Sequence, residues 1–262
     1  MTQPRIIQSV TILGSGNVAS WFAYALHQKG IEIQQIYSPN LEHAQHLAHP
    51  YQAEAICNLK QLYTKSDLYI FSVKDSAYPT LMAQLPTQIP LGVITAGTLS
   101  QQILASSCQN YGVLYPYQTI SQKSDFKNLI VPLCVEGNNE STTKKLKEFA
   151  DIISYKSFII SEVKRKKLHL AAVFGSNFTN AMYGISYDLM KQSDLPPTLL
   201  LPILECTLQK IQHLSPWESQ TGPAKRRDTN VMQEQLQALS ANPTLQEIYK
   251  LISQYIIEKT NQ

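Results

Sequence analysis

Short apolar runs alternate with amphipathic stretches through the first 160 residues of the chain. This alternation is typical of strand–helix–strand units around a parallel sheet. A Ser/Thr-capped, Lys-rich helix is predicted from about Ser141 to Ile153. The runs that predict buried strands are Ser9–Leu13, Ile31–Tyr37, Leu68–Val73, Gly92–Thr95, Gly112–Tyr115, Ile130–Val135 and Ser157–Ile160.

The strand pattern stops near residue 160, and only helical periodicity follows. We expect a long helix from Glu162 to about Gln192, a break at Pro196-Pro197, a helix to about Leu214, and two more helices after Asp228 and Pro243. The predicted fold class is α/β. A mostly parallel sheet domain covers residues 1–160, and an all-α C-terminal domain covers residues 161–262.

Composition narrows the classes of partner. The 262 residues include 22 Lys and Arg against 19 Asp and Glu, and a net charge of +3 is too even to indicate nucleic acid or an anionic membrane. Only 16 % of residues are charged, and 25 glutamines supply much of the remaining polarity. No run of about 18 apolar residues exists, and polar residues interrupt the stretch from Ile6 to Leu13, so we expect neither a membrane span nor a secretory signal, but a cytoplasmic protein.

The cysteines and histidines form no recognisable set of metal ligands. The cysteines lack a C-x-x-C pair and are expected to be reduced and mostly buried: Cys57, Cys108, Cys134 and Cys206. Three histidines recur at helical spacing, with only the adjacent Glu42 to add a carboxylate: His43, His46 and His49. We therefore predict no metal site.

The segment from Val10 to Ala19 is the most informative local pattern. It reads VTILGSGNVA, a strand that runs into G-x-G-x-x-A and then into a predicted helix. In such a loop Gly14 permits a tight turn, Gly16 lets the backbone approach a pyrophosphate, and N–H groups at the helix start bind the anion. We predict a Rossmann-like dinucleotide site rather than a loop with chance glycines; its residues are Gly14, Ser15, Gly16, Asn17 and Val18.

The end of the second predicted strand bears on which dinucleotide binds. A site that prefers NAD usually has an acidic side chain about 20 residues after the glycines, where this chain has Tyr37-Ser38-Pro39-Asn40. Ser38 and Asn40 can donate hydrogen bonds to a 2′-phosphate, and no carboxylate repels it. We predict NADP (NADPH) rather than NAD, and expect a weak grip on the 2′-phosphate because the usual arginine is missing. An ordinary turn is the alternative for this segment. The missing acid also leaves a methyltransferase only a minor alternative.

Further candidates follow the other strands, because ligands of an open parallel sheet bind beyond the carboxyl ends of its strands. Three groups stand at such ends: Lys74-Asp75-Ser76, which follows Val73, then Ala96-Gly97-Thr98, and then Pro116-Tyr117-Gln118-Thr119. Asp75 is either a cofactor ligand or a helix cap, and capping is favoured. Gly97 would let the chain pass close to a nicotinamide ring, or it marks a simple turn.

The predicted helix from Leu168 to Tyr187 is apolar enough to be buried, yet it has a polar stripe. At about 100° per residue, His169, Ser176 and Asn180 fall within about 20° of one line, with Asn177 to one side. Unsatisfied polar groups on a buried helix would cost about 1–3 kcal/mol each. We expect the stripe to meet other protein groups, a water or a substrate.

Two basic runs lie in the helical half of the chain: Lys164-Arg165-Lys166-Lys167 and Lys225-Arg226-Arg227. Such a run is usually a solvated face, but four cations at a helix start oppose the helix dipole and require an anionic neighbour. This local basicity fits an anionic cofactor or a small acidic substrate better than a polyanion.

These motifs together resemble a family of bacterial two-domain proteins designated NADP oxidoreductases. Their N-terminal domain is similar to pyrroline-carboxylate reductase and to deazaflavin-dependent NADP oxidoreductases. The resemblance implies a Rossmann-like fold, an NADP cofactor, and a homodimer through the helical domain. The segments that show it are Gly14–Ala19, Val73–Asp75, Thr95–Thr98, Tyr115–Thr119, His169–Phe174 with Asn177, and Thr221–Ala224.

Two departures from the resemblance concern the chemistry. Many members of the family have His where this chain has Tyr115. In related hydroxyacid dehydrogenases a catalytic Lys stands four residues before an Asn, whereas here Val173 stands four before Asn177 and Ser176 four before Asn180. That catalytic pair is therefore not carried over.

Two functions follow from these patterns. The first is an NADP-dependent reductase of a small C=O or C=N substrate bound between the domains, with His169 as proton donor or polariser and Asn177 and Thr98 as orienting residues. The second is a non-enzymatic protein in which dinucleotide occupancy controls a partner. We favour the first, because a Rossmann domain followed by a helical domain usually places a substrate at the junction.

Overall fold

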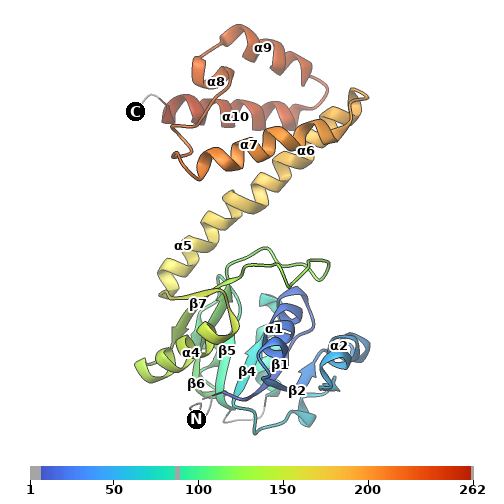
Figure 1. Cartoon of the computed structure of the whole chain (residues 1–262), viewed down its shortest axis with the longest axis vertical. Helices are drawn as coiled ribbons and strands as arrows, with labels where there is room; N and C mark the ends of the chain where they lie inside the picture. The colour runs from blue at the N-terminus through green and yellow to red at the C-terminus, as the bar shows by residue number, and fades with distance from the viewer. Residues whose placement is uncertain (1–6, 86–88, 261–262) are drawn as a thin grey trace. The chain divides into compact units, whose positions relative to one another are not determined.

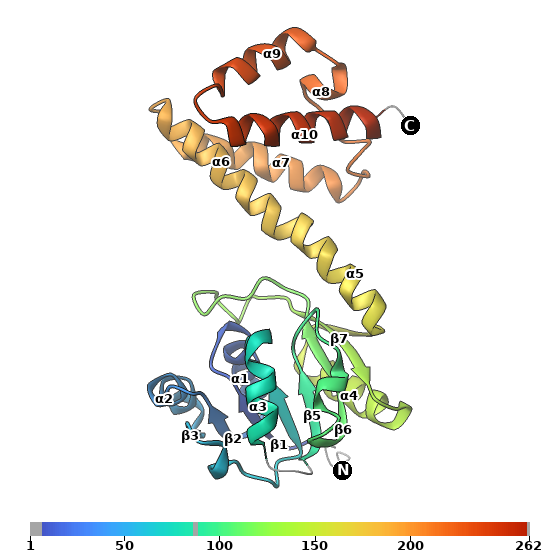
Figure 2. The same cartoon turned by 180° about the vertical axis from the view of Figure 1, so that it is seen from behind.

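The chain forms two compact units, shown in Figures 1 and 2. The computed structural model describes residues 7–85 and 89–260. The first unit ends at Thr179 and the second begins at Asn180. The boundary predicted at residue 160 marks the end of the last strand, β8 (Lys156–Ile159), and the helix that follows β8 contacts the sheet domain and belongs to the first unit.

The sheet of the first unit contains these strands: β1 (Ser9–Leu13), β2 (Glu32–Tyr37), β3 (Glu54–Ile56), β4 (Leu68–Phe71), β5 (Ile89–Ile94), β6 (Cys108–Pro116), β7 (Pro132–Gly137) and β8. Their order is β3-β2-β1-β4-β5-β6-β7-β8, and the pairs are parallel except for β6 with β7. The mostly parallel sheet is therefore confirmed. The strand order reverses between β1 and β4, which is where ligands of such sheets bind.

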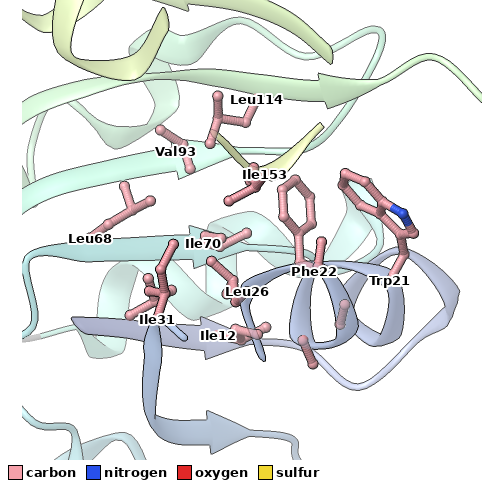
Figure 3. Close-up of a cluster of buried hydrophobic side chains, with 14 of the residues drawn as sticks. Ile12, Trp21, Phe22, Leu26, Ile31, Leu68, Ile70, Val93, Leu114 and Ile153 are labelled. Carbon is pink, nitrogen blue, oxygen red and sulfur yellow. The ribbon is translucent and has the colours of Figure 1, made fainter. Parts of the chain in front are cut away.

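Helices cover both faces of this sheet (Figures 1 and 2). On one face α1 (Asn17–Gln28), α2 (Leu41–Ala48) and α4 (Glu140–Ile153) pack on the strands, and Figure 3 shows Phe22, Leu26 and Ile153 beside Ile12 and Ile70 in this core. On the other face, α3 (Tyr78–Gln84) adds its buried residues to those of β4. Removal of this apolar surface from water is the main force that holds the layers together.

A long helical segment follows the sheet, as predicted. It consists of α5 (Glu162–Ala172), the π-helical turn η5 (Val173–Phe178) and α6 (Thr179–Gln192). The expectation that this segment is buried is wrong for the single chain, since Leu170, Phe174 and Phe178 are 58 %, 62 % and 50 % exposed. The π-helical turn also interrupts the regular rotation of 100° per residue that the predicted polar stripe assumed.

The second unit is helical, as predicted. After α6 come η6 (Pro197–Leu200), α7 (Leu201–Ile211), α8 (Pro223–Arg226), α9 (Thr229–Ala238) and α10 (Pro243–Lys259). Among its described residues only Ala224 and Ser253 are buried. None of the helices described is both long enough and apolar enough to cross a membrane.

Two of the four cysteines are buried as expected, Cys108 and Cys134, whereas Cys57 and Cys206 are exposed. All four are free thiols. No group of three His, Cys, Asp or Glu side chains that could hold a metal is found over residues 7–85 and 89–260.

Candidate functional site

The glycine-rich loop joins β1 to α1 at the point where the strand order reverses. Gly14 has φ +128°, and a Cβ at this position would lie 2.0 Å from the carbonyl oxygen of Ser72, so only glycine fits. Around Gly16, by contrast, no heavy atom lies within 4 Å of an added Cβ. Gly16 precedes α1 and has no side chain to cap it, which leaves N–H groups of the first helical turn for an anion.

A pocket of about 770 Å³ opens beside this loop. That volume is in the range of small-molecule and cofactor sites. Six predicted cofactor residues line it: Gly14, Ser15, Gly16, Ser38, Val73 and Lys74. The structure thus brings residues from three strand ends to one pocket, as the glycine motif requires of a dinucleotide site.

The two predicted phosphate donors after β2 differ in their surroundings. Ser38 is buried and lines the pocket. Asn40 is the N-cap of α2, and its Oδ1 accepts hydrogen bonds from the backbone N–H groups of Glu42 at 2.9 Å and His43 at 3.4 Å. Asn40 therefore has a structural role in starting α2.

Replacement of Asn40 tests this capping role. Asn40→Ala is expected to lower the free energy of unfolding by about 1 kcal/mol, because the first turn of α2 loses its acceptor. Asn40→Asp keeps an acceptor and should stay within about 0.5 kcal/mol of the unaltered protein. Urea denaturation measures both values, and equal losses for the two variants would contradict the capping role.

Gln122 makes hydrogen bonds to the glycine-rich loop and to α1. No sequence pattern indicated that this residue belongs to the site. Its Nε2 donates to the carbonyl oxygen of Ser15 at 3.1 Å and to Oγ of Ser20 at 3.0 Å, and its backbone N–H donates to Oδ1 of Asn17 at 3.1 Å. In the same segment after β6, the hydroxyls of Thr119 and Ser176 are 2.9 Å apart. The segment therefore contacts both the glycine-rich loop and η5.

The loops after β4 and β5 are joined by a pair of predicted site residues. Oγ1 of Thr98 donates to Oδ2 of Asp75 at 2.9 Å. The favoured capping role of Asp75 is wrong, because the N-cap of the 3-10 helix η3 (Asp75–Ala77) is Lys74 and the carboxylate instead accepts from Thr98. Thr98 and Asp75 are both exposed at this edge of the sheet.

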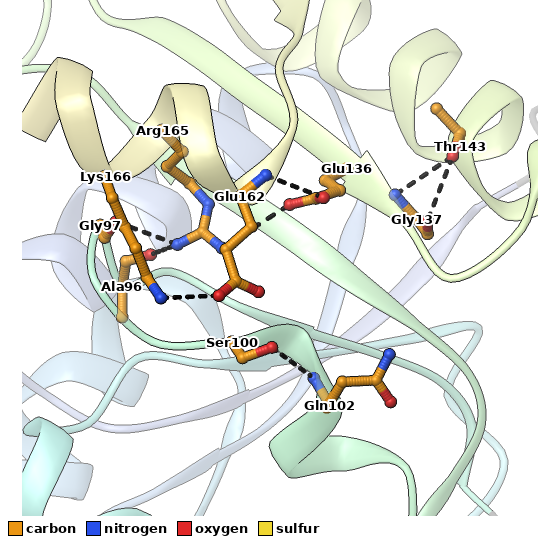
Figure 4. Close-up of polar contacts among 10 residues, drawn as sticks. All are labelled: Ala96, Gly97, Ser100, Gln102, Glu136, Gly137, Thr143, Glu162, Arg165 and Lys166. Atoms are coloured by element: carbon orange, nitrogen blue, oxygen red, sulfur yellow. Dashed lines mark hydrogen bonds and ion pairs between the residues drawn. The ribbon is translucent and has the colours of Figure 1, made fainter.

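Arg165 anchors the loop after β5 to α5 (Figure 4). Its side chain is 0 % exposed, Nη1 donates to the carbonyl oxygens of Ala96 at 2.9 Å and Gly97 at 3.0 Å, and Nη2 lies 3.6 Å from Oε2 of Glu136. The expectation of a solvated basic run is therefore wrong for Arg165. The anionic neighbours that the run required are Glu136 for Arg165 and Glu162 for Lys166, whose Nζ is 2.7 Å from Oε1.

His169 lies on α5 against the same loop. Its Nδ1 is 3.0 Å from the hydroxyl of Tyr115, and a Cβ on Gly97 would lie 2.7 Å from that nitrogen. Gly97 is therefore needed for the close packing of the imidazole. Burial raises the pKa of Tyr115 to about 12, so the phenol keeps its proton near neutral pH. Its hydroxyl can both donate and accept a hydrogen bond, so it orients the imidazole through Nδ1 in either protonation state of the ring.

The other predicted catalytic residue, Asn177, is exposed on η5. Its neighbour Ser176, not Asn177, is the residue of that turn that bonds the segment after β6. The site edge thus combines Gly97, Tyr115 and His169 in direct contact, with Thr98 next to them in the chain and Asn177 separate.

A valine at residue 16 is expected to remove dinucleotide binding without unfolding the protein. The Cβ has open space, and the backbone at Gly16 (φ −84°, ψ −171°) suits any residue. The branched side chain would occupy the approach of a pyrophosphate to the loop. Calorimetric titration with NADPH should show affinity lowered about 100-fold or more, roughly 2.7 kcal/mol, with an unchanged urea midpoint. Unchanged affinity would contradict the assignment of this pocket.

Comparison with known proteins agrees with this architecture. Residues 9–96 match the family described as NADP oxidoreductase, coenzyme F420-dependent, and residues 131–256 match a domain of unknown function, DUF2520. No curated protein matches the chain.

Solved structures match nearly the full length of the chain. A candidate NADP oxidoreductase from Bacteroides fragilis is 35 % identical over 97 % of this chain and 99 % of that chain, with a TM-score of 0.89. A protein from Thermotoga maritima is 25 % identical over 96 % and 98 %, with a TM-score of 0.71. The 1-pyrroline-5-carboxylate reductase of Streptococcus pyogenes shares the fold at 17 % identity over 95 % and 98 %, with a TM-score of 0.64. The chain therefore belongs to the two-domain family of the Bacteroides fragilis protein, in which a domain of the F420-dependent NADP oxidoreductase type precedes a DUF2520 domain.

Proposed function

We propose that the protein is an NADP-dependent oxidoreductase that transfers a hydride between NADPH and a small C=O or C=N substrate. One observation supports this most: the pocket at the glycine-rich loop and the Tyr115–His169 pair lie at the carboxyl ends of strands of one sheet. That edge is where open parallel sheets bind ligands.

The residues present fit a dinucleotide. Gly14 and Gly16 give the tight turn and the open approach, α1 offers its first N–H groups, and Ser38 and Lys74 line the same pocket. When bound, the nicotinamide supplies the hydride chemistry, and the protein supplies binding and orientation. Within the proposal, Val73, Ala96 and Gly97 lie beside the nicotinamide end.

His169 is proposed to provide the proton. In the imidazolium form both ring nitrogens carry protons: Nδ1–H donates to the Tyr115 oxygen, and Nε2 gives its proton to the oxygen or nitrogen of the substrate as negative charge develops there, which leaves a neutral imidazole. Tyr115 then acts as a positioning residue in the place where many family members have His. Thr98 and Asn177 are the residues proposed to orient the substrate.

The substrate class rests on analogy at the level of fold. The Streptococcus pyogenes relative is a 1-pyrroline-5-carboxylate reductase, and a further structure with the same fold, at 14 % identity, is a reductive aminase from Aspergillus terreus. Those names support a C=N or C=O substrate for this chain. That the helical domain forms the other wall of the substrate site stays a prediction from the sequence.

A second function is favoured by the segment after β6. Through Gln122 and Thr119 this segment joins the glycine-rich loop to η5. In a non-catalytic dinucleotide-responsive protein, such a connection would let cofactor binding alter the long helix. Dinucleotide binding without turnover on any small carbonyl or imine would favour this alternative.

We also propose a homodimer through the helical domain. A chain segment of this size normally buries an apolar core, yet α7 exposes Leu201, Ile203 and Leu208 by 45 %, 62 % and 59 %, and an apolar groove of about 310 Å³ runs between α6 and α10. Sedimentation velocity is expected to give twice the chain mass of 29.5 kDa. A monomer at micromolar concentration would contradict this proposal.

A thermal-shift series tests the proposed cofactor. NADPH at about 100 times its dissociation constant should stabilise the protein by about 2.7 kcal/mol and raise the melting temperature, and NADH should do so less. S-adenosylmethionine, the cofactor of the minor methyltransferase alternative, should have no effect. The proposal would be contradicted if only S-adenosylmethionine raised the melting temperature, or if neither NADPH nor NADH raised it.

A further inference from the structure

The pocket at the glycine-rich loop is lined by basic side chains and by no acidic ones among the described residues. The basic side chains are those of Lys74, His43 and His46. His43 and His46 are three residues apart on α2, so they share one helix face. The pair belongs to no metal-ligand group of the described residues. An anion is therefore the ligand that this lining favours.

The position of His43 indicates which anion. β2 ends at Tyr37, Ser38 and Pro39 follow it along the pocket wall, and His43 is the next ionisable side chain that lines the pocket. In sheets of this type the end of the second strand meets the ribose 2′-position, and an arginine nearby usually accommodates a 2′-phosphate. No arginine is found among the described residues of this pocket. His43 therefore lies where the arginine that accommodates a 2′-phosphate is usually found.

We propose that His43 is a specificity-determining residue that binds the 2′-phosphate of NADP(H) and thereby sets the preference over NAD(H). The inference rests on the proposed function, since it places a dinucleotide in this pocket. A hydrogen bond between a charged donor and phosphate is stronger than one between neutral groups. A ring N–H of an imidazole can donate such a hydrogen bond to a phosphate oxygen.

The other titratable groups facing the pocket are few. They are His46 on α2, Tyr51 after it, and Lys74 after β4. Glu42 and His49 also lie on or next to α2 but are not part of the lining. His46, one helical turn farther from β2, contributes less than His43.

The test uses the full chain and compares dissociation constants for NADPH and NADH by calorimetry. The unaltered protein should bind NADPH at least about tenfold more tightly than NADH, equivalent to about 1.4 kcal/mol. His43→Gln should lose most of this preference. His43→Lys, which supplies a cation beside the phosphate, should retain it. His49→Gln is the matched control and should behave like the unaltered protein.

Each other outcome is decisive. Retention of the full preference for NADPH in His43→Gln, or its loss only in His46→Gln, would overturn the assignment to His43. Equal affinity of the unaltered protein for NADPH and NADH would also overturn it and leave the proposed oxidoreductase function standing. If the folded protein bound neither nucleotide, the proposed function itself would fail. Adenosine 2′,5′-bisphosphate against 5′-AMP should give the same ratios without the nicotinamide end.

Discussion

Arg165→Ala is expected to lower the free energy of unfolding of the first unit by about 3–5 kcal/mol, the range for breaking a buried ion pair. The Arg165 side chain is fully buried, and its loss would leave the carbonyl oxygens of Ala96 and Gly97 without their donor. It would also leave the Glu136 carboxylate without its cation and create a cavity where the guanidinium packs. Few single substitutions combine these effects.

Urea denaturation followed by tryptophan fluorescence measures the free energy of unfolding of the first unit. The chain has two tryptophans, and Trp21 is 3 % exposed in the core of the first unit, so a Trp217→Phe background makes the signal specific for that unit. Lys166→Ala is the matched control: its ion pair with Glu162 is partly exposed, and its loss should cost less than about 0.5 kcal/mol. Similar values for the two variants would contradict the anchoring role of Arg165.

A double replacement refines this prediction. Arg165→Met combined with Glu136→Gln removes both charges, so neither is left uncompensated. We expect the double variant to be more stable than Arg165→Met alone. Were the double variant to lose the sum of the two single losses, the pair would not be coupled, and the 3.6 Å separation between Arg165 and Glu136 would be incidental.

His169→Gln is expected to lower the rate of substrate reduction by about 100-fold or more, the lower part of the range for loss of a general acid. The affinity for NADPH should change less than about twofold, equivalent to 0.4 kcal/mol, because His169 contacts Tyr115 and the Gly97 loop and is not among the residues that line the pocket. Glutamine retains a polar side chain but cannot act as a titrating acid near neutral pH.

Tyr115→Phe is the matched comparison for this substitution. It keeps the imidazole and removes only the hydroxyl that is 3.0 Å from Nδ1. The rate should fall by about 10-fold, less than for His169→Gln, as for other residues that orient a reacting group. Rates are measured as NADPH oxidation with a substrate found by isotope transfer. A His169→Gln rate within about threefold of the unaltered protein, equivalent to 0.65 kcal/mol, would exclude His169 as the proton donor.

The parts of the fold that sequence predicted are those fixed by local patterns. Apolar runs gave β1, β2, β4 and β6, and the glycines gave the loop before α1, because period and turn chemistry operate over a few residues. The strand β3 escaped prediction because its three residues, Glu54–Ile56, are too few to show an alternation. The short helix α8 was missed for the same reason.

Contacts between distant parts of the chain could not be predicted. Asp75 with Thr98, Arg165 with Gly97 and Gln122 with Ser15 join segments that are far apart in sequence, and their residue types fit ordinary caps and solvated faces equally well. The burial of the long helix was misjudged because its apolar residues were assigned to the core of one chain, whereas Phe174 and Phe178 are exposed in it.

Transfer of deuterium from NADPH labelled at C4 tests the central claim most directly. The labelled cofactor, in both stereochemical forms, is incubated with the protein and a pool of small carbonyl and imine metabolites, and products are analysed by mass spectrometry. We predict that one form transfers deuterium to carbon of a product in the pool, and that the Gly16→Val variant transfers none. Tight NADPH binding with no labelled product from any pool would contradict the account.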